Sequence, residues 1–478
     1  MQRVNLCKLL SSLRATSISA VIISRVPRLE TALKISHVAM ATRRDRRLSK
    51  DADPHVTKEA GARATTGGGG ELLLRAGEVG DPHLGDLGAE SAISNTQIVG
   101  AYSCQGMNHS RPKANQDCGC VAHPLGGDEA AVLLAVYDGH GPDGTAVSQH
   151  ILQAMHFELE KCESEKLRRD PAAALAAAFK EVQEGIIKLS KQPGTPVDGT
   201  ESGACSLVAY LRGSTFVDSQ ALPSWTLWVA NAGDCVAVLA RKVLDGQSGG
   251  LAAAASAASD VNGVKHITGK AERLRLESCS AAPAARFSAI KLSTAHKPNL
   301  PNEQKRIESM GGWVRETEYD KEDGEVLNPA RFYRQKGEAN RHKGPGLAIS
   351  RSIGDLNATK CGMTAEPEVI KHELRLCNTS LPKTAKAKPS KQPSGDGTEE
   401  DAFLIFASDG VWEFLSAQDA VDIVAPVYAK GGPAIDATKR LIDRAKAEWL
   451  ENDGDFYRDD ITALVVFVPR LLEALHPH

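Results

Sequence analysis

The sequence predicts an α+β fold, because strand-like runs and amphipathic helical patterns both occur along one chain. At least four runs rich in Val, Ile and Leu have the length and apolar character of buried strands. Two helical patterns follow the first of these runs. Composition and periodicity predict nothing finer than the α+β class.

The first predicted strand is the apolar segment 131–136, and residues 145–161 then carry apolar side chains at helical spacing. A second helix is predicted with Asp170 as its N-cap and Pro171 at its first position. We expect its apolar stripe to pack against a sheet. Segments 206–211 and 225–230 are predicted to be strands of that same sheet.

The later part of the chain predicts three more helices. A short one spans 303–310, with Asn302 as its cap and Gly311 and Gly312 at its end. Another begins after Ser416, where Asp419 completes a capping-box pattern. A third covers 434–451.

Two predicted insertions interrupt the folded part. Residues 243–286 contain a Gly/Ala/Ser-rich low-complexity tract, and residues 377–401 mix Lys, Pro, Ser and Gly as surface loops do.

Composition excludes several classes of protein. The chain has 478 residues, which could hold about three average domains, although larger single domains are common. A net charge of −3 does not show the basic excess that is typical of nucleic-acid-binding proteins. The ten cysteines form no Cys-x-x-Cys pair, which favours reduced thiols inside a cell. No apolar run is long enough for a membrane span.

The N-terminal part differs from the rest of the chain. Residues 1–29 contain basic but no acidic side chains, which is typical of a mitochondrial or plastid transit peptide. A disordered cytoplasmic tail is an equal alternative, and the basic cluster at 43–47 would suit nuclear import. Residues 48–95 are Gly- and Asp-rich, and we expect them to be mostly disordered.

Four segments of strand character each carry an aspartate at one end. Asp138, Asp234 and Asp409 follow apolar runs, each with a glycine beside it, and Asp459 lies just before the run 461–468. One such aspartate is usually a turn residue or a helix cap. Four are better explained by convergence on one site, where cations would neutralise their mutual repulsion. Oxygen-only ligands favour Mg²⁺ or Mn²⁺ over Zn²⁺.

The order of these motifs resembles the protein phosphatase 2C family, the metal-dependent Ser/Thr protein phosphatases. The resemblance covers about residues 99–468, and its motifs lie at 115–117, 138–141, 202–206, 230–234, 296–298, 303–312, 347–355, 407–410 and 459–462. It implies a four-layer α-β-β-α sandwich, in which helices flank two antiparallel sheets and a metal cleft lies at one end. A variable flap would occupy 313–343. We therefore expect an N-terminal extension at 1–95, a catalytic domain at 96–470 and a tail at 471–478.

The resemblance also implies roles for the residues around Asp138. This aspartate would bridge two Mg²⁺ or Mn²⁺ ions, Asp409 and Asp459 would hold the first, and the Gly139 carbonyl would help to hold the second. A bridging hydroxide would attack phosphorus directly, without a phosphoenzyme. His140 would protonate the leaving Ser or Thr oxygen. The alternative for His140 is a hydrogen bond within the turn.

Other acids receive supporting roles. Asp234 resembles the acid that helps to bind a third, weaker ion, and Asp117 is interpreted either as an orienter of metal-bound waters or as a structural residue. Asp355 and Arg351 are assigned structural roles. Asp460 is predicted to be a turn or cap residue.

Two positions depart from the family pattern. Gln116 stands where a glutamate is common, so the second ion would bind more weakly. Pro112 stands where an arginine often binds the phosphate. The flanking Arg111 and Lys113 are candidates for that role, with salt bridges or solvent exposure as the alternative.

Three functional hypotheses follow. The first is a phosphatase acting on phosphorylated Ser/Thr proteins, with a monomer as the default state. The second is a catalytically weakened pseudophosphatase that acts as a phosphoprotein-binding scaffold. The third is a phosphatase of small metabolites.

Overall fold

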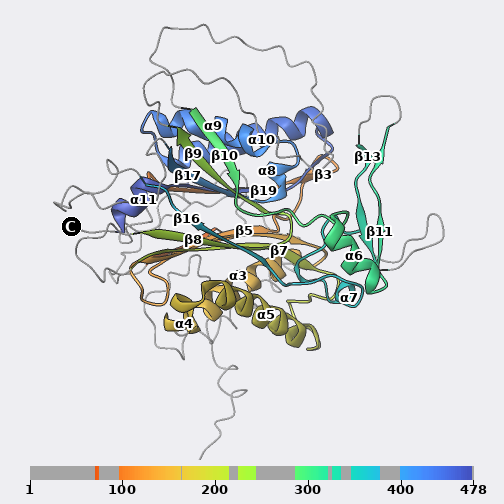
Figure 1. The fold of residues 1–478 in the computed structure, drawn as a ribbon. Coiled ribbons are helices and arrows are strands. Elements are labelled where there is room, and N and C mark those ends of the chain that lie inside the picture. Colours follow the sequence, from red (N-terminus) through yellow and green to blue (C-terminus); the bar gives the residue numbers. More distant parts are fainter. Residues whose placement is uncertain are drawn as a thin grey trace, which may run out of the picture.

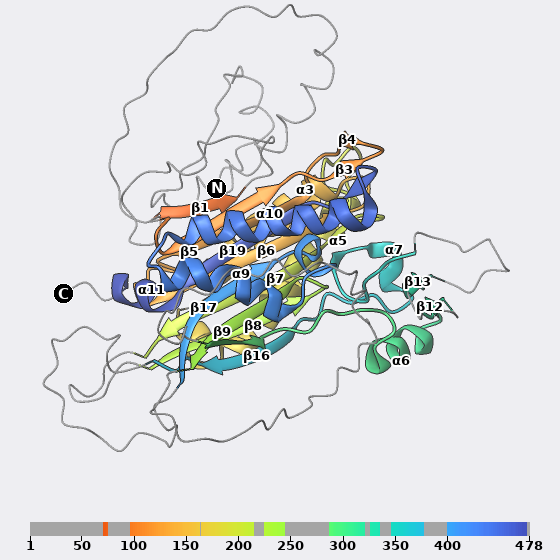
Figure 2. The same ribbon diagram turned by 90° about the horizontal axis from the view of Figure 1, so that it is seen from above.

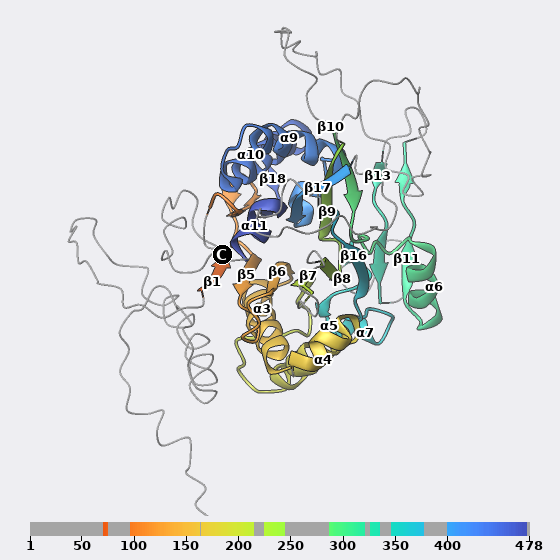
Figure 3. The same cartoon turned by 60° about the vertical axis from the view of Figure 1, so that its left-hand side comes forward.

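The computed structural model describes residues 70–74, 96–162, 164–214, 224–243, 286–320, 326–334, 346–376 and 399–475. Two antiparallel sheets lie face to face between two layers of helices (Figures 1 and 3), so the expected four-layer sandwich is confirmed. The predicted transit peptide, the basic cluster at 43–47 and nearly all of both insertions lie outside the described residues.

The first sheet has the strand order β1-β5-β6-β7-β8-β16, with β15 beside β7. Its outer face is covered by the helices predicted after residue 141, and Asp170 caps the second of them by accepting a hydrogen bond from the Ala173 N–H. The strands are β1 (Gly70–Leu74), β5 (Asp117–His123), β6 (Ala131–His140), β7 (Gly203–Gly213), β8 (Trp225–Ala232), β15 (Ile353–Gly354) and β16 (Glu368–Glu373). The helices are α3 (Gly144–Lys161), α4 (Ser164–Arg169) and α5 (Pro171–Ser190).

The second sheet has the order β10-β9-β17-β19-β2. The capping box at Ser416 and Asp419 is present at the start of the helix predicted there. The strands are β2 (Val99–Cys104), β9 (Val236–Val243), β10 (Arg286–Lys291), β17 (Glu399–Ala407) and β19 (Ile461–Phe467). The helices are α8 (Asp409–Trp412), α9 (Ala417–Ala429), α10 (Ala434–Asp453) and α11 (Val468–Ala474).

Smaller elements surround one end of the sandwich (Figure 2). One group is a three-stranded sheet of β3 (Met107–Asn108), β4 (Arg111–Pro112) and β18 (Tyr457–Arg458). The other contains the strands of the predicted flap, which are β11 (Trp313–Arg315), β12 (Glu318–Tyr319), β13 (Val326–Asn328) and β14 (Arg331–Tyr333). The helices α6 (Pro301–Ser309) and α7 (Leu356–Thr359) precede and follow the flap in sequence.

Burial on both faces explains the uninterrupted apolar character of the central strands. In β6, Val132, Leu134 and Val136 point into the core between the sheets, whereas Leu133 and Tyr137 point towards the helices. A third cluster lies between the second sheet and α9 and α10. In the described part of the chain, no helix combines the length and hydropathy that a membrane span needs.

Several predicted boundaries were wrong. The helix predicted at 303–310 begins at Pro301 with Leu300 in the N-cap position, because proline is preorganised for the first helical turn. Within the stretch 48–95, which we expected to be mostly disordered, the structure describes only Gly70–Leu74, an edge strand whose backbone pairs with β5.

Two other boundaries were displaced at buried positions. Residues 399–401, assigned to the second insertion, belong to β17, and Asp401 is buried there because Arg241 pairs with it at 2.8 Å. The predicted tail at 471–478 overlaps α11, whose Leu471 and Leu472 are buried in the core between the sheets.

Candidate metal centre

Three of the predicted metal ligands meet at one end of the sandwich. Asp138 lies near the end of β6, Asp234 follows β8, and Asp409 begins α8 directly after β17. Their carboxylate oxygens lie within 4.8 Å of one another. The two sheets therefore contribute jointly to this acidic group, because β6 and β8 belong to one sheet and β17 to the other.

The electrostatics of the group favour a bound cation. Burial raises the pKa of Asp138 well above its usual range, and the nearby charges of Asp117 and Asp409 raise it further. The pKa of Asp409 is raised for the same reasons, with Asp234 as its strongest charged neighbour. Burial acts on Asp234 in the same direction, but the ammonium of Lys297 at 2.6 Å outweighs it and lowers the pKa.

The backbone at Gly139 also allows close approach. A Cβ at this position would lie 2.5 Å from the Gln116 carbonyl oxygen and 2.7 Å from that of Gly144. Only glycine fits without a backbone shift. An oxygen-only donor set, mutual repulsion and a glycine backbone together fit a hard divalent cation.

Asp459 lies beside this group but outside its closest set. Its Oδ1 is 2.5 Å from the Lys113 ammonium, and its Oδ2 accepts a hydrogen bond from the Tyr457 hydroxyl at 3.1 Å. Its charge is still close enough to raise the pKa values of Asp138 and Asp409. The structure therefore places Asp234, not Asp459, with the other two acids in the tightest cluster.

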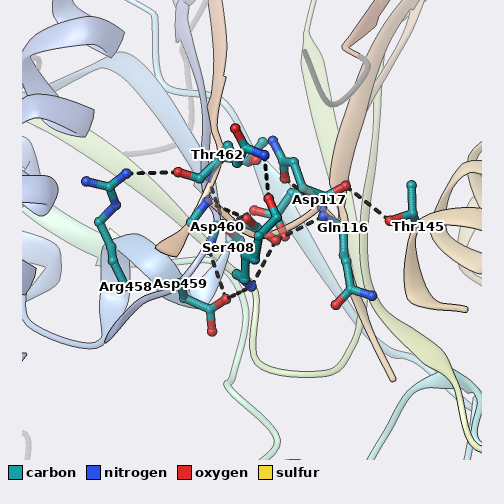
Figure 4. A network of polar contacts seen from close by, with 12 residues as sticks. Gln116, Asp117, Thr145, Ser408, Arg458, Asp459, Asp460 and Thr462 are labelled. Carbon is teal, nitrogen blue, oxygen red and sulfur yellow. Dashed lines mark hydrogen bonds and ion pairs between the residues drawn. The ribbon is translucent and has the colours of Figure 1, made fainter. Parts of the chain in front are cut away.

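Asp117 lies behind the cluster, opposite Asp138 in the β5–β6 pairing. It is buried and accepts a hydrogen bond from the Ser408 hydroxyl at 2.7 Å, in the polar network of Figure 4. Burial raises its pKa to about 7, and the charge of Asp460 adds to this effect. Asp117 is therefore placed to accept or hold a proton next to the acids.

Asp460 and Gln116 form hydrogen bonds that connect the loops at this end of the sandwich. The buried Asp460 carboxylate accepts hydrogen bonds from the backbone N–H groups of Gly106 at 2.6 Å and Gln116 at 2.9 Å. The Gln116 side chain donates to the Gly141 carbonyl at 2.8 Å. Gln116 thus holds the turn after β6.

His140 has a partner that was not predicted to belong to the site. Its Nε2 lies 2.7 Å from Oδ2 of Asp355, which also accepts a 2.5 Å hydrogen bond from the Ser352 hydroxyl. Burial lowers the pKa of His140, but the charge and hydrogen bond of Asp355 outweigh burial and raise it. The sequence signal for this partner was the aspartate that follows a glycine in the motif at 347–355. We interpreted that aspartate as structural.

A protein-family model matches most of the folded part of the chain. The model described as "Protein phosphatase 2C" matches residues 99–248, 284–381 and 382–454. The chain belongs to the protein phosphatase 2C family.

Named relatives are similar over most of the chain. "Probable protein phosphatase 2C 64" of Oryza sativa subsp. japonica is 28% identical and spans 80% of this chain and 68% of the relative. "Probable protein phosphatase 2C 34" of Arabidopsis thaliana is 24% identical over 88% of this chain and 89% of the relative. A solved structure, "Crystal structure of serine-threonine phosphatase 2C from Toxoplasma gondii", is 17% identical and covers 77% of this chain and 94% of that chain, with a TM-score of 0.48.

In this member of the protein phosphatase 2C family, the two basic phosphate-binding candidates lie in different environments. Arg111 is exposed on β4, whereas the Lys113 ammonium lies 2.5 Å from Asp459 and 3.0 Å from Asp460. The structure therefore brings Lys113, and not Arg111, into contact with the acidic residues at this end.

The loop that carries Asp355 is anchored to α6 through buried Glu303. This carboxylate accepts hydrogen bonds from the Ser350 hydroxyl at 2.6 Å and from the Arg351 guanidinium at 2.7 Å, and it pairs with Arg306 at 2.8 Å. The predicted structural role of Arg351 agrees with these contacts. The flap region and the partner of His140 are thereby joined in one network.

Proposed function

We propose that this protein hydrolyses phosphoserine and phosphothreonine in proteins, with Mg²⁺ or Mn²⁺ held by Asp138, Asp234 and Asp409. The observation that carries the proposal is the meeting of these three carboxylates within 4.8 Å in a family of phosphatases. When bound, divalent ions would stabilise charge on the phosphoryl oxygens and lower the pKa of an attacking water molecule.

Several oxygen ligands would be needed to hold two ions. Asp138, Asp409 and the Gly139 carbonyl would hold these ions. Asp234 is the proposed ligand of a third, weaker ion, for which it must exchange its Lys297 partner at 2.6 Å. Asp459 would help Asp409 to hold the first ion when the Lys113 ammonium releases it. Asp117, with its pKa raised to about 7, orients water behind the ligands.

His140 is the proposed general acid. The proton that it gives to the leaving Ser or Thr oxygen balances the negative charge that develops there when the P–O bond breaks. Asp355 orients the imidazole and stabilises its protonated form. The Lys113 ammonium is the cation nearest to Asp459, and it attracts the substrate phosphate to the site.

A catalytically weakened scaffold is the second candidate function, and the Lys113–Asp459 ion pair favours it. This ammonium pairs with one predicted metal ligand, Asp459, at 2.5 Å and competes with a metal ion for that carboxylate. If the pair persists, the protein would bind phosphoproteins with little turnover.

The test measures hydrolysis of p-nitrophenyl phosphate and of a phosphothreonine peptide with Mn²⁺, with EDTA, and in the Asp138→Ala variant. Asp422→Ala, which removes an exposed carboxylate on α9, is the matched control. We expect the unchanged protein and Asp422→Ala to hydrolyse both substrates with Mn²⁺. We expect hydrolysis to be lost with EDTA and in Asp138→Ala. Equal rates in all conditions would exclude the proposal, and peptide binding without turnover or Mn²⁺ binding would favour the scaffold.

A further inference from the structure

A pocket of about 220 Å³ lies between the C-terminal half of α10, β18 and β3. Figures 1 and 2 both show the end of α10 beside β3. Met107, Ala447, Leu450 and Tyr457 provide the apolar part of its lining. Nothing in the proposed chemistry uses this pocket.

The surface around the pocket exposes large apolar side chains. Of its lining residues, Leu450 is 57% exposed and Tyr457 is 36% exposed, and the two lie within one short stretch of sequence. Exposed apolar side chains that gather at a concave site are typical of binding surfaces. The volume is also sufficient, because a cavity of about 150 Å³ holds a benzene molecule. The pocket therefore fits one Leu- or Phe-sized side chain.

One wall of the pocket is linked to the edge of the proposed catalytic site by a hydrogen bond. Tyr457 lines it and donates a hydrogen bond to Asp459 at 3.1 Å. The two residues are separated by one position on an extended segment, and two extended residues span about 7 Å. A peptide held at the acidic group would therefore pass the mouth of the pocket within a few residues.

The walls are fixed before any ligand arrives. The Tyr457 ring packs edge-on against Trp449, with ring centroids 5.8 Å apart. The Trp449 indole N–H donates to the Gly410 carbonyl at 2.7 Å, next to Asp409. Arg458 donates to the Gln105 carbonyl at 2.9 Å. A preformed pocket loses little entropy on binding, which favours selectivity.

We infer that this pocket receives one apolar side chain of the phosphoprotein substrate, close in sequence to the phosphorylated residue. The inference rests on the proposed function, because it assigns the occupant to the substrate of that site. The hydrogen bond from the lining residue Tyr457 to Asp459, whose charge acts on Asp138 and Asp409, favours a substrate residue over a separate partner. The pocket would thus determine which phosphorylated sequences are hydrolysed fastest.

The test uses phosphothreonine peptides in an alanine background, with a single leucine moved through the positions on both sides of the phosphorylated residue. The full-length protein is compared with Leu450→Asp and with Met107→Glu on the facing strand. Phe157→Asp on α3 is the matched control, because Phe157 is also an exposed large apolar side chain, 39% exposed, on the opposite helix layer. Hydrolysis of p-nitrophenyl phosphate reports the chemistry without the pocket.

One leucine position is expected to raise kcat/KM about tenfold in the unchanged protein and in the control. In both pocket variants this preference should fall to within about twofold, while hydrolysis of p-nitrophenyl phosphate is unchanged. Active protein without any positional preference would overturn the inference and leave the proposed function intact.

Absence of p-nitrophenyl phosphate hydrolysis would instead refute the proposed function. Fluorescence anisotropy with the same peptides then decides the inference: a positional preference in affinity that Leu450→Asp removes supports it, and a flat series overturns it. Dimers in sedimentation experiments that Leu450→Asp dissociates would identify a second copy as the occupant, which also overturns it.

Discussion

Replacing Glu303 by glutamine should destabilise the anchor between α6 and the loop that carries Asp355. Glu303 is 3% exposed and neutralises two guanidinium groups, those of Arg306 and Arg351, while accepting a hydrogen bond from Ser350. Glutamine keeps the shape of the side chain but removes its charge. The two arginines would then lose the counter-ion that they share.

The size of the effect follows from the burial of the partners. Breaking a buried ion pair costs about 3–5 kcal/mol of unfolding free energy. Arg351 and Arg306 keep 19% and 25% of their side chains exposed. They also keep backbone acceptors, the carbonyls of Glu366 at 3.0 Å and Gly362 at 2.9 Å. We therefore expect the lower end of the range, about 3 kcal/mol.

Urea denaturation of Glu303→Gln and of Glu308→Gln measures this difference. Glu308 lies on the same helix, but it is exposed, and its carboxylate accepts a hydrogen bond from the neutral Gln304 amide at 3.0 Å. Its replacement should change the unfolding free energy by less than about 0.5 kcal/mol. Equal effects of the two replacements would refute the reasoning.

The difference between the unchanged protein and Glu303→Gln should also depend on pH. Burial raises the pKa of Glu303, but hydrogen bonds from Arg351, Arg306 and Ser350 outweigh it and hold the pKa well below its usual range. A carboxylate whose pKa is lowered by folding contributes its full stability above its unfolded pKa of about 4.3. The difference should be constant from neutral pH to about pH 5 and shrink in more acidic solution. A difference that grows on acidification would contradict this sign.

Three further predictions concern the acidic group. Lys113→Met should raise the affinity for Mn²⁺ about tenfold, because it removes the ammonium that competes for Asp459. Calorimetry measures this affinity, and a weaker affinity would contradict the prediction. Asp355→Asn should lower kcat about 100-fold through loss of the His140 contact, with the Mn²⁺ dissociation constant unchanged; lost metal binding would argue for a ligand role instead. Gly139→Ala should lower the unfolding free energy by about 2 kcal/mol in thermal denaturation, because the methyl group would lie 2.5 Å from a backbone carbonyl; an unchanged midpoint would show that the turn relaxes freely.

Local patterns predicted the five longest helices, β7 and the strands at whose ends the four aspartates lie, but not the other elements. The helices α5 and α9 were predicted with their N-caps, since Asp170 and Ser416 satisfy backbone groups a few residues away in sequence. Helix α6 was predicted with the wrong cap, because Asn302 is a strong capping residue and only the chain path selects Pro301 as the start. The leucines of α11 were assigned to a tail because a short helix at the end of the described chain has little periodicity to detect.

By itself the sequence determined the class of fold and the aspartates at strand ends, because strand length, helix periodicity and capping act between neighbouring residues. Only the tertiary structure decided which acids meet. His140 and Asp355 are 215 positions apart, and Lys113 and Asp459 are 346 apart. The packing of the two sheets also placed Asp234 rather than Asp459 in the closest group. Such choices depend on angles and offsets between whole layers, which no local pattern encodes, and so the sequence alone could name the candidates but not their partners.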